Sequence, residues 1–114
     1  MRQPVEIALF TDEVAALRRF YELLLGGAPE AEWPGGAIFA AGNVKVLVHE
    51  RAEAMTGGPA NEDHFAVGVP DVDSACDELC AEGLELLVAP RAYPWGRSAY
   101  LRDPDGRMVE LSQT

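Results

Sequence analysis

Three side chains of this 114-residue chain could form a metal or acid–base site: Glu6, His64 and Glu110. One imidazole and two carboxylates make a nitrogen and oxygen set that suits a divalent ion of Mn, Fe, Co, Ni, Zn or Mg. Such an ion would polarise paired oxygens of a small substrate. Without an ion, the same groups could transfer protons, because burial raises the pKa of a carboxyl group. We therefore take all three as candidate metal ligands, and Glu6 and Glu110 also as candidate catalytic carboxylates.

Alternation along three predicted strands places these side chains on equivalent faces. Each strand has one apolar side, and Glu6, His64 and Glu110 belong to the other side, where small residues follow the first two. Small residues behind a polar one suit the floor of a cavity, so we expect the three to converge on one hollow. Each residue also has a purely structural explanation. His64 could lie at an exposed loop edge, Glu110 could be solvated, and Glu6 could pair with Arg97 or Arg102.

The strands that carry these residues belong to a pattern that occurs twice. A strand, a helix and three short strands follow one another in residues 5–49, and the same order returns in residues 64–113. This pattern predicts an α+β fold in which two βαβββ modules form a curled eight-stranded mixed sheet around a cavity, with the helices outside. We expect one domain over residues 1–114, with module one at about 4–50, a linker at about 51–62 and module two at about 63–113.

The segment Asp103-Pro104-Asp105-Gly106, followed by Val109-Glu110-Leu111, resembles the C-terminal signature of the vicinal oxygen chelate superfamily. This superfamily holds glyoxalases, bleomycin-resistance proteins and extradiol dioxygenases, and residues 93–97 (YPWGR) also look like its members. The resemblance implies the same curled sheet and a homodimer. It also implies that Glu110 and His64 match metal ligands of the metal-dependent members. Glu6 stands where relatives carry His or Gln.

Two functions follow from this resemblance. The favoured one is a glyoxalase-type enzyme that depends on a divalent metal and performs lyase, isomerase or transferase chemistry on a small oxygenated substrate. The alternative is a metal-free binding protein of the bleomycin-resistance kind, which would sequester a flat or cationic compound at a dimer cleft. Glyoxalase I itself is disfavoured, because it has a Glu on the last strand of module one and residues 44–48 (VKVLV) contain no carboxylate.

Aromatic and cationic side chains could line such a cavity. Flat ligands stack on aromatic rings, and Arg97 could hold a ligand carboxylate. For Trp33 and Phe39 packing in the core is the stronger interpretation, and for Trp95, in a loop with Pro and Gly, a place at the mouth is equally reasonable. The candidate ligand-binding residues are Trp95, Tyr100, Arg97, Trp33 and Phe39.

Composition narrows the range of partners. Nineteen acidic residues against nine basic ones give a net charge of −10, which disfavours nucleic acid as a partner, since binding it requires neutralised phosphates. No apolar run has membrane-spanning length and no signal pattern begins the chain, so we expect a cytoplasmic protein. Cys76 and Cys80 share one helix face, and we expect both to be buried free thiols.

Overall fold

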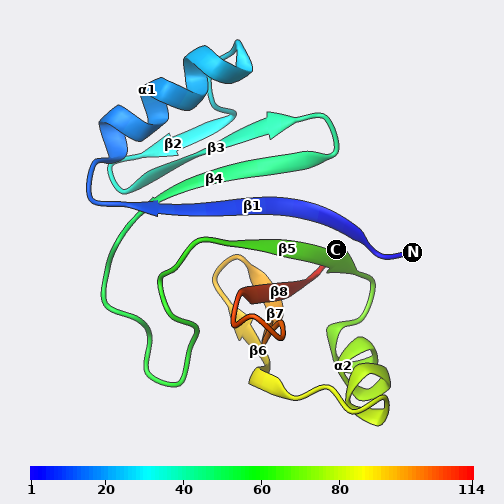
Figure 1. The fold of residues 1–114 in the computed structure, drawn as a ribbon. Helices are drawn as coiled ribbons and strands as arrows, with labels where there is room; N and C mark the ends of the chain where they lie inside the picture. The colour runs from blue at the N-terminus through cyan, green and yellow to red at the C-terminus, as the bar shows by residue number, and fades with distance from the viewer.

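The computed structural model describes all 114 residues as one eight-stranded mixed sheet with two helices (Figure 1). This confirms the predicted α+β fold of paired modules. The strands run in the order β2-β3-β4-β1-β5-β8-β7-β6 across the sheet. Module one consists of β1 (Gln3–Thr11), α1 (Val14–Leu25), β2 (Ala31–Trp33), β3 (Gly36–Ala41) and β4 (Val44–Glu50). Module two consists of β5 (His64–Val69), α2 (Val72–Ala81), β6 (Leu86–Tyr93), β7 (Gly96–Arg102) and β8 (Met108–Gln113).

The two modules join edge to edge within one chain. β1 pairs with β5 in antiparallel register, and these two strands cross the centre of Figure 1 side by side. In each module the first strand also pairs in parallel with the last, β1 with β4 and β5 with β8. The sequence predicted the duplicated modules but left open whether they pair within or between chains. The continuous sheet settles this point in favour of pairing within the chain.

Both helices cover the same face of the sheet, here called the helix face. Beneath α1, the buried side chains of Ala37, Phe39, Val46 and Val48 form one core cluster. Beneath α2, a second cluster combines helix residues with strand residues from β5, β7 and β8, including Val69 and Leu111. These strand residues have the parity that sequence alternation assigned to the core. The opposite face, here called the concave face, is free of helices and carries the polar candidates.

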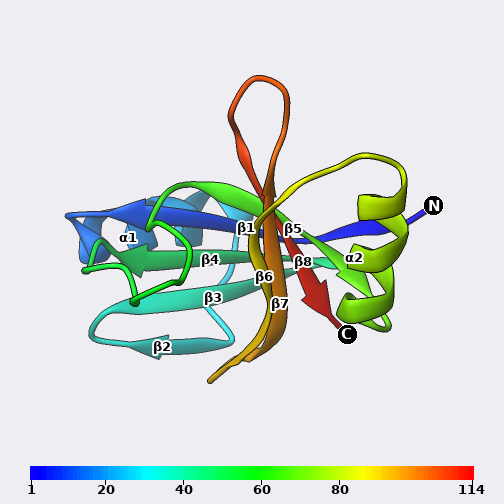
Figure 2. The ribbon, with the colours of Figure 1, turned by 90° about the horizontal axis from the view of Figure 1, so that it is seen from below.

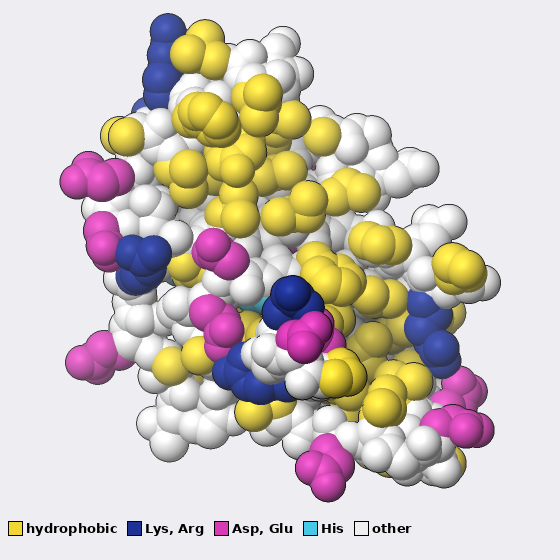
Figure 3. All heavy atoms as spheres, in the orientation of Figure 1, with side chains coloured by type: hydrophobic (Ala, Val, Ile, Leu, Met, Phe, Trp, Pro, Cys, Tyr) yellow, Lys and Arg dark blue, Asp and Glu magenta, His cyan; other side chains and the backbone are white.

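The two helices leave part of their apolar side chains exposed. The Asp71 side chain caps α2 by accepting a hydrogen bond from the Ser74 amide at 3.1 Å. Cys76 is buried as expected, but the expectation for Cys80 is wrong, because Cys80 is exposed while Leu79 beside it packs against the cluster beneath α2. On α1, Phe20 and Leu24 are more than half exposed. Figure 3 shows apolar side chains gathered in the upper part of the view, where Figure 1 draws α1 and β2–β4. Neither helix combines the length and apolar character needed to cross a membrane.

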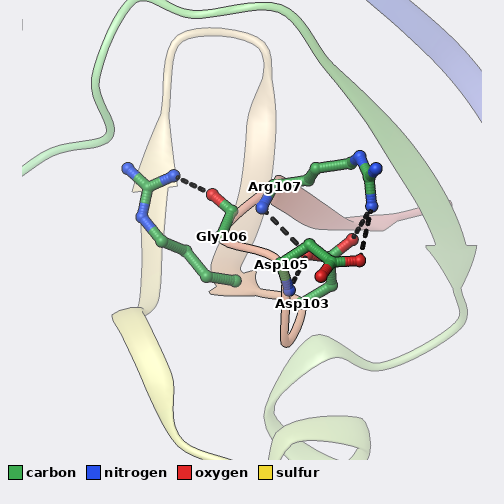
Figure 4. Close-up of polar contacts among 5 residues, drawn as sticks. Asp103, Asp105, Gly106 and Arg107 are labelled. Atoms are coloured by element: carbon green, nitrogen blue, oxygen red, sulfur yellow. Dashed lines mark hydrogen bonds and ion pairs between the residues drawn. The ribbon is translucent and has the colours of Figure 1, made fainter.

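A tight turn between β7 and β8 positions Glu110 (Figure 4). One oxygen of Asp103 accepts hydrogen bonds from the amides of Asp105 and Arg107, both at 2.9 Å. Gly106 has φ +88°, a conformation that residues with a Cβ rarely adopt. Arg102 donates to the Gly106 carbonyl at 2.8 Å, and Figure 2 shows the turn projecting away from the sheet. The turn sets β7 and β8 in antiparallel register, with Tyr100 opposite Glu110.

Candidate functional site

The register of three strands places the three predicted polar residues on the concave face. Glu6 on β1 lies opposite Ala66 on β5, and Ala66 lies opposite Glu110 on β8. His64 stands two residues before Ala66 and therefore points to the same face. Ala66 is buried and small, so the side chains on either side of it can approach one another across the sheet. Tertiary pairing thus assembles a site from residues that are 58 and 46 positions apart.

His64 and Glu110 form the centre of this site. Their side chains are each only 6% exposed, and His64 Nε2 lies 3.1 Å from Glu110 Oε1. Ser98 donates a hydrogen bond to the other carboxylate oxygen of Glu110 at 2.8 Å. His64 Nδ1 lies 2.8 Å from the carbonyl oxygen of Glu62, which can only accept a hydrogen bond. Nδ1 therefore carries a proton. The 3.1 Å contact between Nε2 and Glu110 needs a further proton, or another cation, between its two atoms.

Electrostatics couple Glu6 to this pair. Burial raises the pKa of Glu6, and the nearby charge of Glu110 raises it further, against smaller opposing effects of His64 and Lys45. For His64, burial lowers the pKa, but the hydrogen bonds to Glu110 and to the Glu62 carbonyl, with the charges of Glu110 and Glu6, raise it by more. The net result is a raised pKa for both groups. Glu6 thus retains a proton, and His64 its positive charge, to higher pH than either would in water.

Glu6 also opens onto a cavity. A hollow of about 300 Å³ lies beside this side chain at the ends of the strands. Its lining includes the polar side chains of Glu6, Asn43, Lys45 and Ser112. Lys45 is held on its outer side by an ion pair with Glu30 at 2.8 Å. Neither Arg97 nor Arg102 pairs with Glu6, because Arg97 binds Asp73 and Arg102 binds Glu62. The carboxylate therefore remains accessible to a small molecule.

Aromatic rings cross the concave face in an unbroken series. Neighbouring ring centroids lie 4.6–6.3 Å apart from the β2 edge to the β6–β7 turn. His64 occupies the middle, 6.0 Å from Phe10 on one side and 6.0 Å from Tyr100 on the other. In order, the rings are Trp33, His49, Phe10, His64, Tyr100, Tyr93 and Trp95. The face around the polar centre is thus lined with flat apolar surfaces.

The remaining ligand-binding candidates are placed differently. Trp33, Tyr100 and Trp95 belong to the aromatic series, with Tyr100 buried and Trp95 exposed at the turn. Phe39 does not, because its parity on β3 directs it into the cluster beneath α1. Arg97 lies on the helix face, where it makes two hydrogen bonds to Asp73 at 2.6 and 2.8 Å. Neither Phe39 nor Arg97 reaches the concave face.

A family model matches residues 3–111, which is nearly the whole chain, and describes the Glyoxalase/Bleomycin resistance protein/Dioxygenase superfamily. The chain belongs to this superfamily. A "Probable lactoylglutathione lyase" of Synechocystis is 38% identical over 53 residues, which cover 45% of this chain and 40% of that protein. The chain therefore matches well under two thirds of the length of this relative.

Solved structures show how widely the superfamily fold is used. A structure titled as an NAD-dependent benzaldehyde dehydrogenase from Legionella pneumophila has a TM-score of 0.79 at 17% identity, covering 95% of this chain and 96% of that one. Methylmalonyl-CoA epimerase from Mycobacterium tuberculosis has a TM-score of 0.76 at 15% identity, covering 96% and 86%. At such low identity these similarities establish the fold, and the reaction must be inferred from the site.

The donor set of this superfamily member fits a divalent ion in part. The 3.1 Å between His64 Nε2 and Glu110 Oε1 is close to the spacing of about 3 Å between adjacent ligands of an octahedral ion with bonds of about 2.1 Å. The Nδ1 bond to the Glu62 carbonyl orients the ring in the way that metal-bound histidines usually require. As arranged, however, no three His, Cys, Asp or Glu side chains are close enough to hold an ion together. His64 and Glu110 are therefore placed as two ligands, and Glu6, whose charge couples to both, is the candidate for the third.

Sequence reasoning missed three contributors to the site. Ser98 fixes the second oxygen of Glu110, while Phe10 and His49 complete the aromatic series. A usable signal existed for two of them. Phe10 shares the parity of Glu6 on β1, and Ser98 precedes Tyr100 by two residues and so shares its face. For His49, only the parallel pairing of β4 with β1 brings the two rings together.

Proposed function

We propose that this superfamily member is a small-molecule enzyme that uses Glu6, His64 and Glu110 to move a proton on an oxygenated substrate. The observation that carries the proposal is the buried 3.1 Å contact between His64 Nε2 and Glu110 Oε1, which a proton or a divalent ion between the two atoms would satisfy. The cavity beside Glu6 has a volume of about 300 Å³, which lies within the range of small-ligand sites. The aromatic series would hold the flat part of the substrate.

In the metal-dependent form of this proposal, His64 and Glu110 would hold a divalent ion, with Glu6 as the third donor. Such an ion would supply Lewis acidity toward paired substrate oxygens. Ser98 keeps the Glu110 carboxylate in one orientation, and the Glu62 carbonyl does the same for the imidazole. Leu47 is the module-one equivalent of Glu110, because it lies opposite Ala8 on β1 as Glu110 lies opposite Ala66 on β5. It supplies no fourth donor.

Glu6 is the candidate proton acceptor in either form. Glu6 has a raised pKa, and a carboxylate with a raised pKa is a stronger base than an ordinary carboxylate. Its pKa also lies closer to working pH, where a general base is most effective. It would take a proton from a carbon next to a carbonyl group. The protonated His64 imidazole, or an ion held by His64 and Glu110, would stabilise the negative charge that then develops on the carbonyl oxygen. Lyase and isomerase reactions of small carbonyl compounds use this step.

A metal titration tests the metal-dependent form. Calorimetry of chelator-treated protein with Mn²⁺, Ni²⁺ and Zn²⁺ should show one ion per chain and a raised melting temperature. His64→Ala and Glu110→Ala should abolish binding, whereas His49→Ala, which removes the other histidine, should retain it. Absence of binding by the unaltered protein with all three ions would refute the metal-dependent enzyme.

The aromatic series also favours a second function, a metal-free binding protein for a flat compound. In that case the rings, and not the polar centre, would supply the affinity. The unaltered protein should then take up no metal, and a flat cation such as ethidium should quench tryptophan fluorescence equally in the unaltered protein and in Glu110→Gln. The homodimer implied by the family resemblance stays a prediction, which sedimentation at equilibrium checks.

A further inference from the structure

Two side chains of β6 stand beside the polar centre and have no part in it. Arg91 lies opposite Ser98 in the pairing of β6 with β7, and Ser98 donates to Glu110. Tyr93 is two residues further along the same strand and shares the face of Arg91. Tyr93 also packs with Tyr100 and Met108, close to Glu110. Both residues are therefore immediate neighbours of the proposed site.

Arg91 is a cation without a carboxylate partner. The chain has nine basic and nineteen acidic residues, and seven of the nine basic side chains form ion pairs. Only Arg19 and Arg91 have none. The polar contact of Arg91 is a long hydrogen bond, 3.3 Å, to the Thr56 carbonyl, and its guanidinium lies 5.0 Å from the centre of the Tyr93 ring. An unpaired guanidinium in so acidic a chain is a local exception.

Tyr93 carries the one buried side-chain polar atom that lacks a hydrogen-bond partner, its hydroxyl oxygen. The residue is 8% exposed. Buried polar groups nearly always have a partner, because leaving one unpaired costs free energy. Trp95 stacks flat on the Tyr93 ring, with centroids 4.6 Å apart and an angle of 8° between planes, and Trp95 is itself 56% exposed. Movement of this exposed indole would uncover the Tyr93 ring to a ligand.

We infer that Arg91 and Tyr93 form a subsite for an anionic group, a carboxylate attached to a flat or carbonyl-bearing substrate. The guanidinium would pair with the carboxylate, and the Tyr93 hydroxyl would donate a hydrogen bond to one of its oxygens. The rest of the substrate would extend over Tyr100 toward Glu110. This inference rests on the proposed function, because it takes the concave face as the place where a small substrate binds.

The probe for this subsite is phenylglyoxylate, which combines a ring, a carbonyl and a carboxylate, with its neutral methyl ester as the matched ligand. Binding is followed by tryptophan fluorescence and by amide chemical shifts at up to millimolar concentration. A charge-assisted hydrogen bond is worth a factor of about ten to a hundred in affinity. Arg91→Gln should therefore weaken binding of the acid at least about tenfold, and Tyr93→Phe several-fold, with little change for the ester.

Two further variants make the result decisive. Arg19→Gln removes the other unpaired guanidinium and should leave binding of the acid unchanged, and Arg91→Lys should recover part of the affinity because it keeps the charge. Equal affinity of the unaltered protein and Arg91→Gln for the acid would overturn the subsite. So would absence of binding by the unaltered protein. Failure of the metal titration together with an intact dependence on Arg91 would count against the metal-dependent enzyme alone.

Discussion

Replacing Glu110 with Gln tests the electrostatic centre most directly. The substitution keeps the size of the side chain but removes the negative charge that faces His64 at 3.1 Å. Burial lowers the pKa of His64, and the contacts with Glu110 are the largest opposing influence. We therefore expect the pKa of His64 to fall in Glu110→Gln relative to the unaltered protein.

The magnitude follows from the burial of the pair. Both side chains are 6% exposed, so solvent screens their interaction little. A hydrogen bond between charged groups contributes about 1.5–3 kcal/mol, which is the expected loss in free energy of unfolding at a pH where His64 is protonated. Because the folded pKa of His64 is raised above 6.5, its contribution is fully present below pH 6.5 and is lost as pH rises through the folded pKa. One proton gives a slope of at most about 1.4 kcal/mol per pH unit.

The assay is urea unfolding of both proteins at a series of pH values, with NMR titration of the histidine resonances. The chain has only His49 and His64, so His49→Asn assigns the two signals. Glu6 also has a raised pKa, so the stability that comes from its protonation declines as pH rises above 4.5. Each measurement is therefore repeated in Glu6→Gln, which removes this second pH dependence. If Glu110→Gln loses stability with rising pH as steeply as the unaltered protein above pH 6.5, the pair is not coupled as described.

Two further substitutions test the packing and the turn that position this centre. Met108→Ala should lower the free energy of unfolding by about 2–5 kcal/mol, because Met108 is 1% exposed and packs in one cluster with Tyr93 and Tyr100. Met55→Ala, at an exposed methionine, should change the free energy of unfolding by less than about 0.5 kcal/mol in the same denaturation assay. Gly106→Ala should cost about 1–2 kcal/mol, because it places a Cβ at φ +88°. The same change at Gly27, which has equal space for a Cβ but no positive φ, is the control, and equal effects at the two glycines would contradict the role given to the turn.

Strand alternation and the repeated order of elements carried most of the fold prediction. On β8, Leu111 faces the core as the alternation predicts, and the Asp71 cap of α2 and the turn at Gly106 likewise arise from neighbouring residues. These are local effects, since a cap, a turn or strand parity depends on neighbours within a few residues. The same parity placed Glu6, His64 and Glu110 on one face. Helical spacing failed as a guide for Cys80, because the depth to which a helix packs depends on the strands beneath it.

The sequence by itself determined which side chains share a face, because the two-residue period of a strand fixes their direction. It also determined the duplicated modules. Only the tertiary structure decided what those side chains meet. The pairing of β1 with β5 within one chain brings Glu6 toward Glu110, and the register of β7 with β8 brings Ser98 to the same carboxylate. The tertiary structure also pairs Arg97 with Asp73, and it leaves Arg91 without a carboxylate partner and the Tyr93 hydroxyl without a hydrogen bond. The sequence could not show this, because distances between strands depend on pairings that no local pattern specifies.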